Sequence, residues 1–160
     1  MPLSIFLKID GIAGEATAAG HAGEIMLQSF AWGSAAGTTT AGAASGAGAG
    51  KVSFQNATVT KSVDKASPLL FQALASGQRL AECVVTIEQA DQPKQTIALT
   101  LSTCLIESIS EVFEAAAPAS HETIVIGFAK VKFEYTPQSA TGSVEKPVTA
   151  GWDITTNKAV

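Results

Sequence analysis

The sequence predicts a mainly β protein, a small antiparallel β-barrel with one short α-helix packed on its outside. Apolar and polar residues alternate with period two along most of the chain, as is typical of half-buried strands. One segment instead carries the start and stop signals of a short helix. Closure into a barrel would remove exposed strand edges, although alternation does not distinguish a barrel from a sandwich.

The first strands are expected before residue 33. An opening strand over residues 3–9 carries Leu or Ile at every odd position. A second strand over residues 25–32 places Ile25, Leu27 and Ala31 on one face, opposite Phe30 and Trp32. Residues 33–50 contain only Gly, Ala, Ser and Thr, so they lack the apolar surface needed to order themselves. We expect an extended functional loop there.

The helix is expected between residues 67 and 77. Ser67 is a good N-cap, Pro68 suits the first helical position, and Gly77 is a typical C-terminal stop. The apolar residues expected on the side that docks on a sheet are Leu70, Phe71 and Leu74.

Further strands are expected over residues 82–88, 97–105 and 123–135, with a final short strand around residues 151–155. In the strand at 97–105, Leu99, Leu101 and Leu105 share a face and Cys104 lies on the other. In the run 123–135, Val125 is expected on the buried face. The sequence favours reduced, buried thiols for Cys83 and Cys104 over a disulfide or a reactive thiol.

Composition argues for one domain over residues 1–160 and for a covered surface. Charged residues make up 15% of the chain, against roughly 25% in typical globular proteins. A surface so poor in charge favours a homo-oligomer, with a monomer rich in exposed Ala, Ser and Thr as the alternative. The net charge of −4 and the lack of a basic cluster argue against nucleic acid. No signal peptide or membrane-inserting segment is expected.

No catalytic, cofactor-binding or metal-binding residues are predicted, and an enzyme is not expected. Residues 45–52 lack the first Gly and the final hydroxyl of a phosphate-binding loop. His121 and Glu122 begin like a helical zinc motif, but their segment alternates like a strand. The acidic residues near a predicted turn are interpreted as solvated charges: Glu107, Glu111 and Glu114.

Several strings then point to one family. They are FLKIDGIAGE at 6–15, GAGAGKV at 46–52, TKSVDKASPLLFQALASG at 60–77, YTPQSATGS at 135–143 and GWDITTNKAV at 151–160. In this order and spacing, the chain resembles the haemolysin-coregulated protein (Hcp) family, the tube subunit of the bacterial type VI secretion system. The resemblance implies a β-barrel with a flanking helix, rings of six copies, and rings stacked into a hollow tube.

The resemblance also implies partners and a location. The partners are further copies of the chain, the type VI sheath and spike proteins, and effector proteins in the lumen. The protein is expected to assemble in the bacterial cytoplasm and to be expelled without a signal peptide. The alternative within the family is a secreted ring-shaped carrier of effectors that forms no extended tube.

Candidate interface residues follow from the same resemblance. The tract between Trp32 and Lys51 matches the family loop that reaches toward the neighbouring ring. Asp64, Lys65, Trp152 and Asp153 belong to the most specific matching strings, although Trp152 suits a core equally well and Asp64 suits a helix start. The candidates for ring stacking or subunit contact are Trp32, Gly33, Thr38, Thr39, Gly46, Gly48, Gly50, Lys51, Asp64, Lys65, Trp152 and Asp153.

Overall fold

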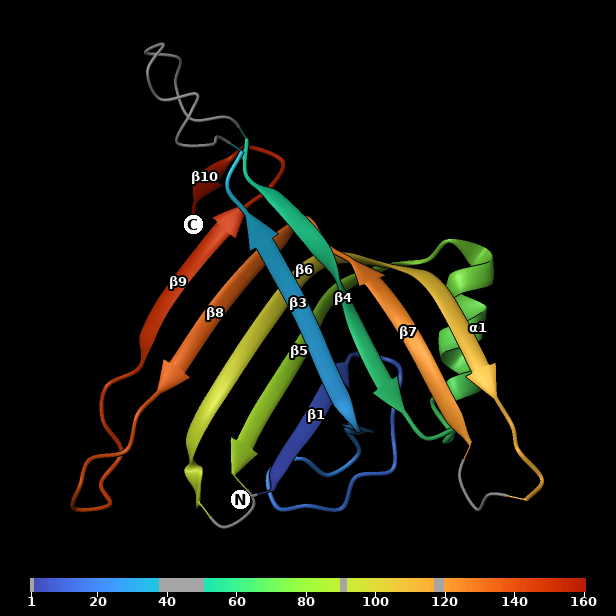
Figure 1. Cartoon of the computed structure of the whole chain (residues 1–160), viewed down its shortest axis with the longest axis horizontal. Helices are drawn as coiled ribbons and strands as arrows, with labels where there is room; N and C mark the ends of the chain where they lie inside the picture. Colours follow the sequence, from blue (N-terminus) through green and yellow to red (C-terminus); the bar gives the residue numbers. More distant parts are fainter. Residues whose placement is uncertain (1, 38–50, 90–91, 117–119) are drawn as a thin grey trace.

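The computed structural model describes residues 2–37, 51–89, 92–116 and 120–160. Within them, antiparallel strands and one helix confirm the mainly β class (Figure 1). In chain order the elements are β1 (Leu3–Ile9), β2 (Ile25–Leu27), β3 (Ser29–Ala35), β4 (Ser53–Lys61), α1 (Ser67–Ser76), β5 (Arg79–Gln89), β6 (Gln92–Val112), β7 (His121–Gly127), β8 (Lys130–Thr136), β9 (Val148–Asp153) and β10 (Lys158–Ala159).

The long strand β6 joins the two layers of the fold. Its first part pairs with β5 on one side and β8 on the other, and its last part pairs with β7. The first layer therefore runs β10-β9-β8-β6-β5-β1-β2, and the second runs from the end of β6 through β7 and β4 to β3. Figure 1 shows β3 and β4 crossing in front of β6 and β5, with β7 beside β4. The core lies between these layers.

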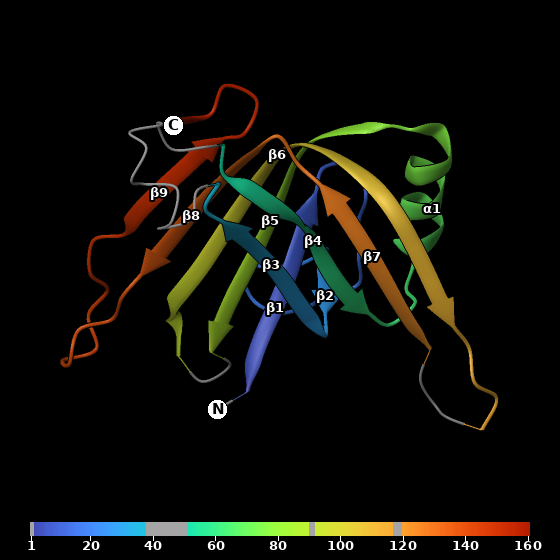
Figure 2. The same cartoon turned by 45° about the horizontal axis from the view of Figure 1, so that its top comes forward.

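The ladder does not close into a complete barrel. Among the described residues, no backbone pairing joins β3 to β2, β9 or β10. On one side of the opening, side chains meet instead, because the rings of Trp32 on β3 and Phe133 on β8 lie 6.0 Å apart between centroids. Figure 2 shows β3 beside β8 and β9 at this seam. The prediction of a barrel is therefore correct in class, while the seam departs from full closure.

The helix begins one residue earlier than expected. Its N-cap is Ala66, which makes no side-chain cap, so Ser67 and Pro68 occupy the first turn. The hydroxyl of Ser67 is engaged elsewhere, as described below. Gly77 ends the helix as predicted, with φ of 65° and its N–H donated to the carbonyl of Leu74.

The buried face of α1 also differs from the prediction. Leu70 and Ala73 are buried and Leu74 is partly buried, but Phe71 is 60% exposed. Successive helical residues are rotated by about 100°, so Phe71 turns away from the stripe that begins at Leu70.

The predicted alternation of β6 changes phase at Thr103. Leu99 and Leu101 are buried as expected, but Cys104 is also buried and Leu105 is partly exposed, so both were assigned to the wrong face. Thr103 has φ of 54°, in the left-handed region that β-branched residues rarely adopt. This residue shifts the alternation by half a period over Cys104 to Ile106, at a cost of about 1–3 kcal/mol. A register shift between Ile106 and Ser108 then shifts it again, so that Ile109 packs against the core.

Two other predicted strands are each divided in two. The run 123–135 bends at residues 128–129, because β7 pairs with β4 and β6 whereas β8 pairs with β6 and β9. The buried residues of β7 are Ile124 and Ile126, so Val125 was assigned to the wrong face. The run 25–32 is interrupted at Gln28, whose N–H binds the carbonyl of Thr60, and beyond it Phe30 packs against the core.

The acidic residues expected near a turn mostly lie on a strand. Glu107 and Glu111 are exposed on β6, and Glu114 is exposed just after it. The side-chain amide of Asn56 on β4 donates to the carboxylate of Glu107. The final strand β9 ends at Asp153, earlier than expected, because the chain then turns into β10.

Candidate functional site

An apolar groove of about 360 Å³ lies at the open seam. Its walls come from β3 and β4 on one side and from β8 and β9 on the other. The lining residues are Trp32, Val52, Phe54, Val131, Phe133, Ala150, Gly151 and Trp152. Four of them are aromatic, and protein interfaces are enriched in such residues. The groove is therefore the described feature best suited to contact another chain.

Local irregularities and strand register position the two tryptophans. The β3–β4 register shifts between Ala31 and Gly33, so Trp32 lies at a bulge that turns its ring toward the seam. On the other wall, Trp152 lies directly across from Val131, and Phe133 across from Ala150. Gly151 is flanked closely by Val160, and an added Cβ would lie 3.1 Å from the Val160 side chain.

The indole N–H of Trp152 is buried without a hydrogen-bond partner among the described residues. A buried unsatisfied donor is costly.

Asp153 fixes the turn that follows Trp152. Its Oδ1 accepts hydrogen bonds from the Thr155 hydroxyl at 2.6 Å, from the Thr155 backbone N–H at 2.9 Å and from the Thr156 N–H at 3.2 Å. The Lys130 ammonium lies 3.7 Å from Oδ2. These contacts, the Thr155 hydroxyl foremost, hold the pKa of Asp153 below its ordinary value of 3.8. The turn therefore holds Trp152 best when Asp153 is ionised.

This lowered pKa predicts acid sensitivity. An Asp that is more acidic in the folded state stabilises the fold above its unfolded pKa, and that contribution is lost as pH falls through the folded pKa. Asp153→Asn should therefore unfold at lower urea than the wild type near neutral pH, and the gap should shrink below about pH 4. Urea unfolding of both proteins between these limits measures the gap. A gap that stays constant with pH would contradict this role for Asp153.

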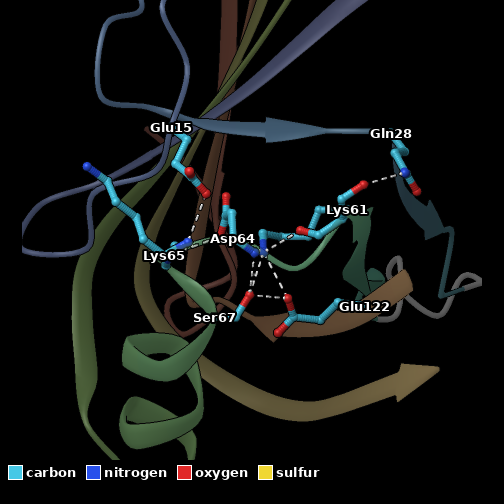
Figure 3. A network of polar contacts seen from close by, with 9 residues as sticks. Glu15, Gln28, Lys61, Asp64, Lys65, Ser67 and Glu122 are labelled. Carbon is cyan, nitrogen blue, oxygen red and sulfur yellow. Dashed lines mark hydrogen bonds and ion pairs between the residues drawn. The ribbon is translucent and has the colours of Figure 1, made fainter. Parts of the chain in front are cut away.

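A second polar site lies at the start of α1, shown in Figure 3. The fully buried Lys61 ammonium lies 2.9 Å from Asp64 Oδ1 and 2.8 Å from Glu122 Oε2. It also donates to the hydroxyl of Ser67 at 3.0 Å and to the carbonyl of Ser62 at 3.0 Å. Ser67 in turn donates to Glu122 Oε2 at 2.7 Å. This ionic cluster joins β4, β7 and α1.

Asp64 and Lys65 contribute to the same region in different ways. Asp64 Oδ1 accepts the Ala66 N–H at 2.9 Å, and the Asp64 N–H donates to the Ser67 hydroxyl at 3.0 Å. The backbone N–H of Lys65 donates to Glu15 at 3.0 Å, while Lys65 itself is exposed. Figures 1 and 2 show α1 at the far side of the molecule from β8 and β9.

The structure thus divides the predicted interface residues. Trp32 and Trp152 share the groove, Asp153 and Gly33 adjoin it in sequence, and exposed Lys51 precedes Val52 of its lining. Asp64 and Lys65 belong to the other end of the fold. The remaining predicted residues lie outside the described part of the chain: Thr38, Thr39, Gly46, Gly48 and Gly50.

The sequence alone did not identify Lys61 and Glu122 as a buried ion pair, nor Phe133 as a residue of the groove. The signal for the first two was present, because Lys61 continues the buried phase of Ala57 and Val59, and Glu122 continues that of Ile124 and Ile126. Two opposite charges on the buried phases of two strands indicate a buried pair once those strands are known to be neighbours. Phe133 lines the groove only because β8 faces β3.

The two histidines contact neighbouring side chains, and His121 Nδ1 lies 3.3 Å from the side-chain oxygen of Gln28. His21 is stacked on Phe6 and its ring nitrogens lie 2.8 Å from Glu24 and 3.3 Å from Glu88. The described ranges contain no group of His, Cys, Asp and Glu side chains arranged to hold a metal ion. In those same ranges, no helix is long and apolar enough to cross a membrane.

Known proteins are similar to this chain in sequence and in fold. Residues 6–135 match the family described as "Type VI secretion system effector, Hcp". The chain is 34% identical over 110 residues to protein hcp1 of Pseudomonas aeruginosa, covering 67% of this chain and 68% of that protein.

Solved structures agree along the whole length. A structure of a type six secretion system protein has a TM-score of 0.91 and 26% identity, covering 99% of this chain and 100% of the other. Hcp1 of Salmonella typhimurium has a TM-score of 0.80 and 32% identity, with both chains fully covered. Because it matches the family model and is similar in sequence to these relatives, the chain belongs to the Hcp family of type VI secretion proteins.

Proposed function

We propose that this chain is the repeating subunit of a type VI secretion tube, in which rings of six copies stack into a hollow cylinder. Membership of the Hcp family and a sequence poor in charged residues support this proposal. The chain acts as one domain, with sheath and spike proteins as neighbours and effector proteins in the lumen. It assembles in the cytoplasm and is expelled, and it performs no catalysis.

The apolar groove at the seam carries the assembly part of this proposal. A ring of identical subunits is built from heterologous contacts, in which one surface of each copy meets a different surface of the next. The groove supplies one such surface, because it gathers two tryptophans and two phenylalanines beside open strand edges.

The assembled state is tested by light scattering on a sizing column, with electron micrographs of the peak. We expect a mass about six times the 16.3 kDa of one chain and annular particles. Rings that never lengthen into tubes, even at high concentration, would favour the carrier function instead. A monomer at high concentration would contradict ring formation by the chain alone.

Phe133→Lys tests the groove itself. Phe133 is 37% exposed, so a lysine there reaches solvent in the free subunit but places a charge in the proposed contact. We expect the subunit to stay folded and its self-association to weaken at least about tenfold.

The matched control is Val144→Lys, which makes the same apolar-to-cationic change at an exposed site outside the groove. Rings should survive this substitution. If Phe133→Lys assembled as well as Val144→Lys, the groove would have no part in the ring. This conclusion would hold whatever mass light scattering gives for the wild-type protein.

A further inference from the structure

The segment between β1 and β2, residues 10–24, which we call the flap, folds back on itself before the chain enters β2. The Gly14 N–H donates to the carbonyl of Gly23 at 2.9 Å, and the Gly23 N–H donates to that of Ala16 at 2.9 Å. The Ala16 N–H in turn donates to the carbonyl of Glu24 at 3.0 Å. These bonds join the flap to itself, so its position on the sheet depends on other contacts.

One aromatic contact places the flap on β1. Phe6 and the core residue Leu7 are neighbours on a strand, so their side chains point to opposite faces. Phe6 is nevertheless only 3% exposed. The ring of His21 covers it, with 4.1 Å between the ring centroids and 4° between the ring planes. The flap is therefore the cover of an aromatic side chain that lies outside the core.

Two carboxylates hold the covering ring from opposite sides. His21 Nδ1 lies 2.8 Å from Glu24 Oε2, and His21 Nε2 lies 3.3 Å from Glu88 Oε2 on β5. The three side chains are only 13–16% exposed. An ionised carboxylate can only accept hydrogen bonds, so both contacts are hydrogen bonds only when both ring nitrogens carry a proton. A neutral imidazole has one N–H and would turn a lone pair toward one of the carboxylates.

The other charged groups near the ring lie farther from it. Lys8 is two residues along the same face of β1 from Phe6 and is exposed, and Glu82 is at the far end of the same face of β5. Within the flap, Asp10 and Glu15 are exposed, and Glu15 accepts a backbone N–H from beyond the flap. The elements β2 and α1 carry no charged residue. The charge of the ring is therefore matched chiefly by the two glutamates that contact it.

We propose that His21, Glu24 and Glu88 form a pH-sensitive clasp, which holds the flap on β1 while the imidazole is protonated and loosens when the imidazole is neutral. The clasp joins the flap to β5 through the Nε2 contact, because Glu88 belongs to that strand. Loss of this contact leaves the flap tied to its own Glu24 alone. The loosened flap then opens locally and exposes Phe6 to solvent.

Acid closes this clasp and alkali loosens it. Free histidine carries its second proton below about pH 6.5, and free glutamate is ionised above about pH 4.3. A histidine that gains two carboxylate partners on folding stabilises the fold while it is protonated, and this contribution is lost as the pH rises. The closed and loosened forms are therefore best compared at about pH 5.5 and about pH 8.5.

Hydrogen exchange of the flap amides tests the clasp at these two pH values. Peptides covering residues 14–24 are followed by mass spectrometry, and the rates are corrected for the intrinsic effect of pH. We expect protection in the wild type to fall roughly fivefold or more at the higher pH, the factor that one lost charge-assisted hydrogen bond gives. His21→Gln should lower protection at the lower pH and abolish the difference. Equal protection of the wild-type flap at both pH values would overturn the proposal.

Glu88→Gln distinguishes the clasp from a contact that only fills space. A carboxamide has the same shape, but it can accept from a protonated ring nitrogen or donate to an unprotonated one. The flap of this variant should therefore stay protected at both pH values. If its protection fell at the higher pH as in the wild type, the charge of Glu88 would have no part in the effect and the clasp would be overturned.

His121→Gln is the matched control for the loss of a histidine. His121 is exposed and lies 3.3 Å from the uncharged side chain of Gln28, so this variant should keep the pH dependence of the wild type. The clasp lies within one subunit and does not depend on the proposed tube. Light scattering at both pH values shows whether assembly changes, and exchange is compared at protein concentrations that give the same mass. Failure of ring formation is thus distinguishable from failure of the clasp.

Discussion

Replacing Lys61 by methionine should lower the free energy of unfolding by about 3–5 kcal/mol. Methionine fills a similar volume but carries no charge. The fully buried Glu122 carboxylate and Asp64 would then lose the ammonium that lies 2.8 and 2.9 Å from them. A buried charge without its partner is far more costly than the intact pair. Urea unfolding at neutral pH and fixed protein concentration, followed by tryptophan fluorescence, gives the difference.

Lys65→Met is the matched control, because Lys65 is exposed and only its backbone N–H makes a described contact, with Glu15. It should change stability by less than about 0.5 kcal/mol. Adding Glu122→Leu to Lys61→Met should recover part of the loss, since the remaining carboxylate, Asp64, is partly exposed. If the double variant were less stable than Lys61→Met alone, the unpaired charge would not be the cause of the loss.

Gly14→Ala should lower the free energy of unfolding by about 1–3 kcal/mol or more. Gly14 is buried, and an added Cβ would lie 2.5 Å from the Cα of Ile25 and 2.8 Å from the carbonyl carbon of Glu24. These are backbone atoms, so the start of β2 would have to move, and Ile25 is fully buried. Urea unfolding of the purified variant measures the loss.

Gly127→Ala provides the contrast. Gly127 is also buried, but its added Cβ would meet the end of the exposed Glu107 side chain, which can move away at the cost of its hydrogen bond from Asn56. This substitution should cost clearly less than Gly14→Ala. Equal losses in the two variants would mean that close approach to backbone is not what requires glycine at position 14.

Local sequence determined the kind of most elements. Period-two alternation identified the strands, and the pair of Pro68 and Gly77 located the helix to within one residue. The sequences of residues 60–77 and 151–160 also identified the family, because several specific strings occur in the family's order. Such signals lie in neighbouring residues, so no knowledge of the tertiary structure is needed to detect them.

Tertiary structure decided which face of each strand is buried. A single left-handed residue, Thr103, reversed the phase of β6 from Cys104 to Ile106, and a bend at residues 128–129 reversed that of β7 relative to the prediction. Alternation specifies a period but not its phase across an irregularity, since one extra half-turn exchanges the two faces. The inward position of Cys104 follows from this reversal.

Both candidate sites needed long-range information. The sequence contained Trp32, Trp152 and Asp64 as candidates, but it could not show that the two tryptophans share a groove while Asp64 belongs to the ionic cluster at the start of α1. Nor could it pair Lys61 with Glu122, which are neighbours only through the register of β4 with β7. The sequence by itself determined the element types, the family and the shortage of surface charge. The tertiary structure decided the burial phases, the open seam and the ionic cluster, because these depend on pairings between residues far apart in the chain.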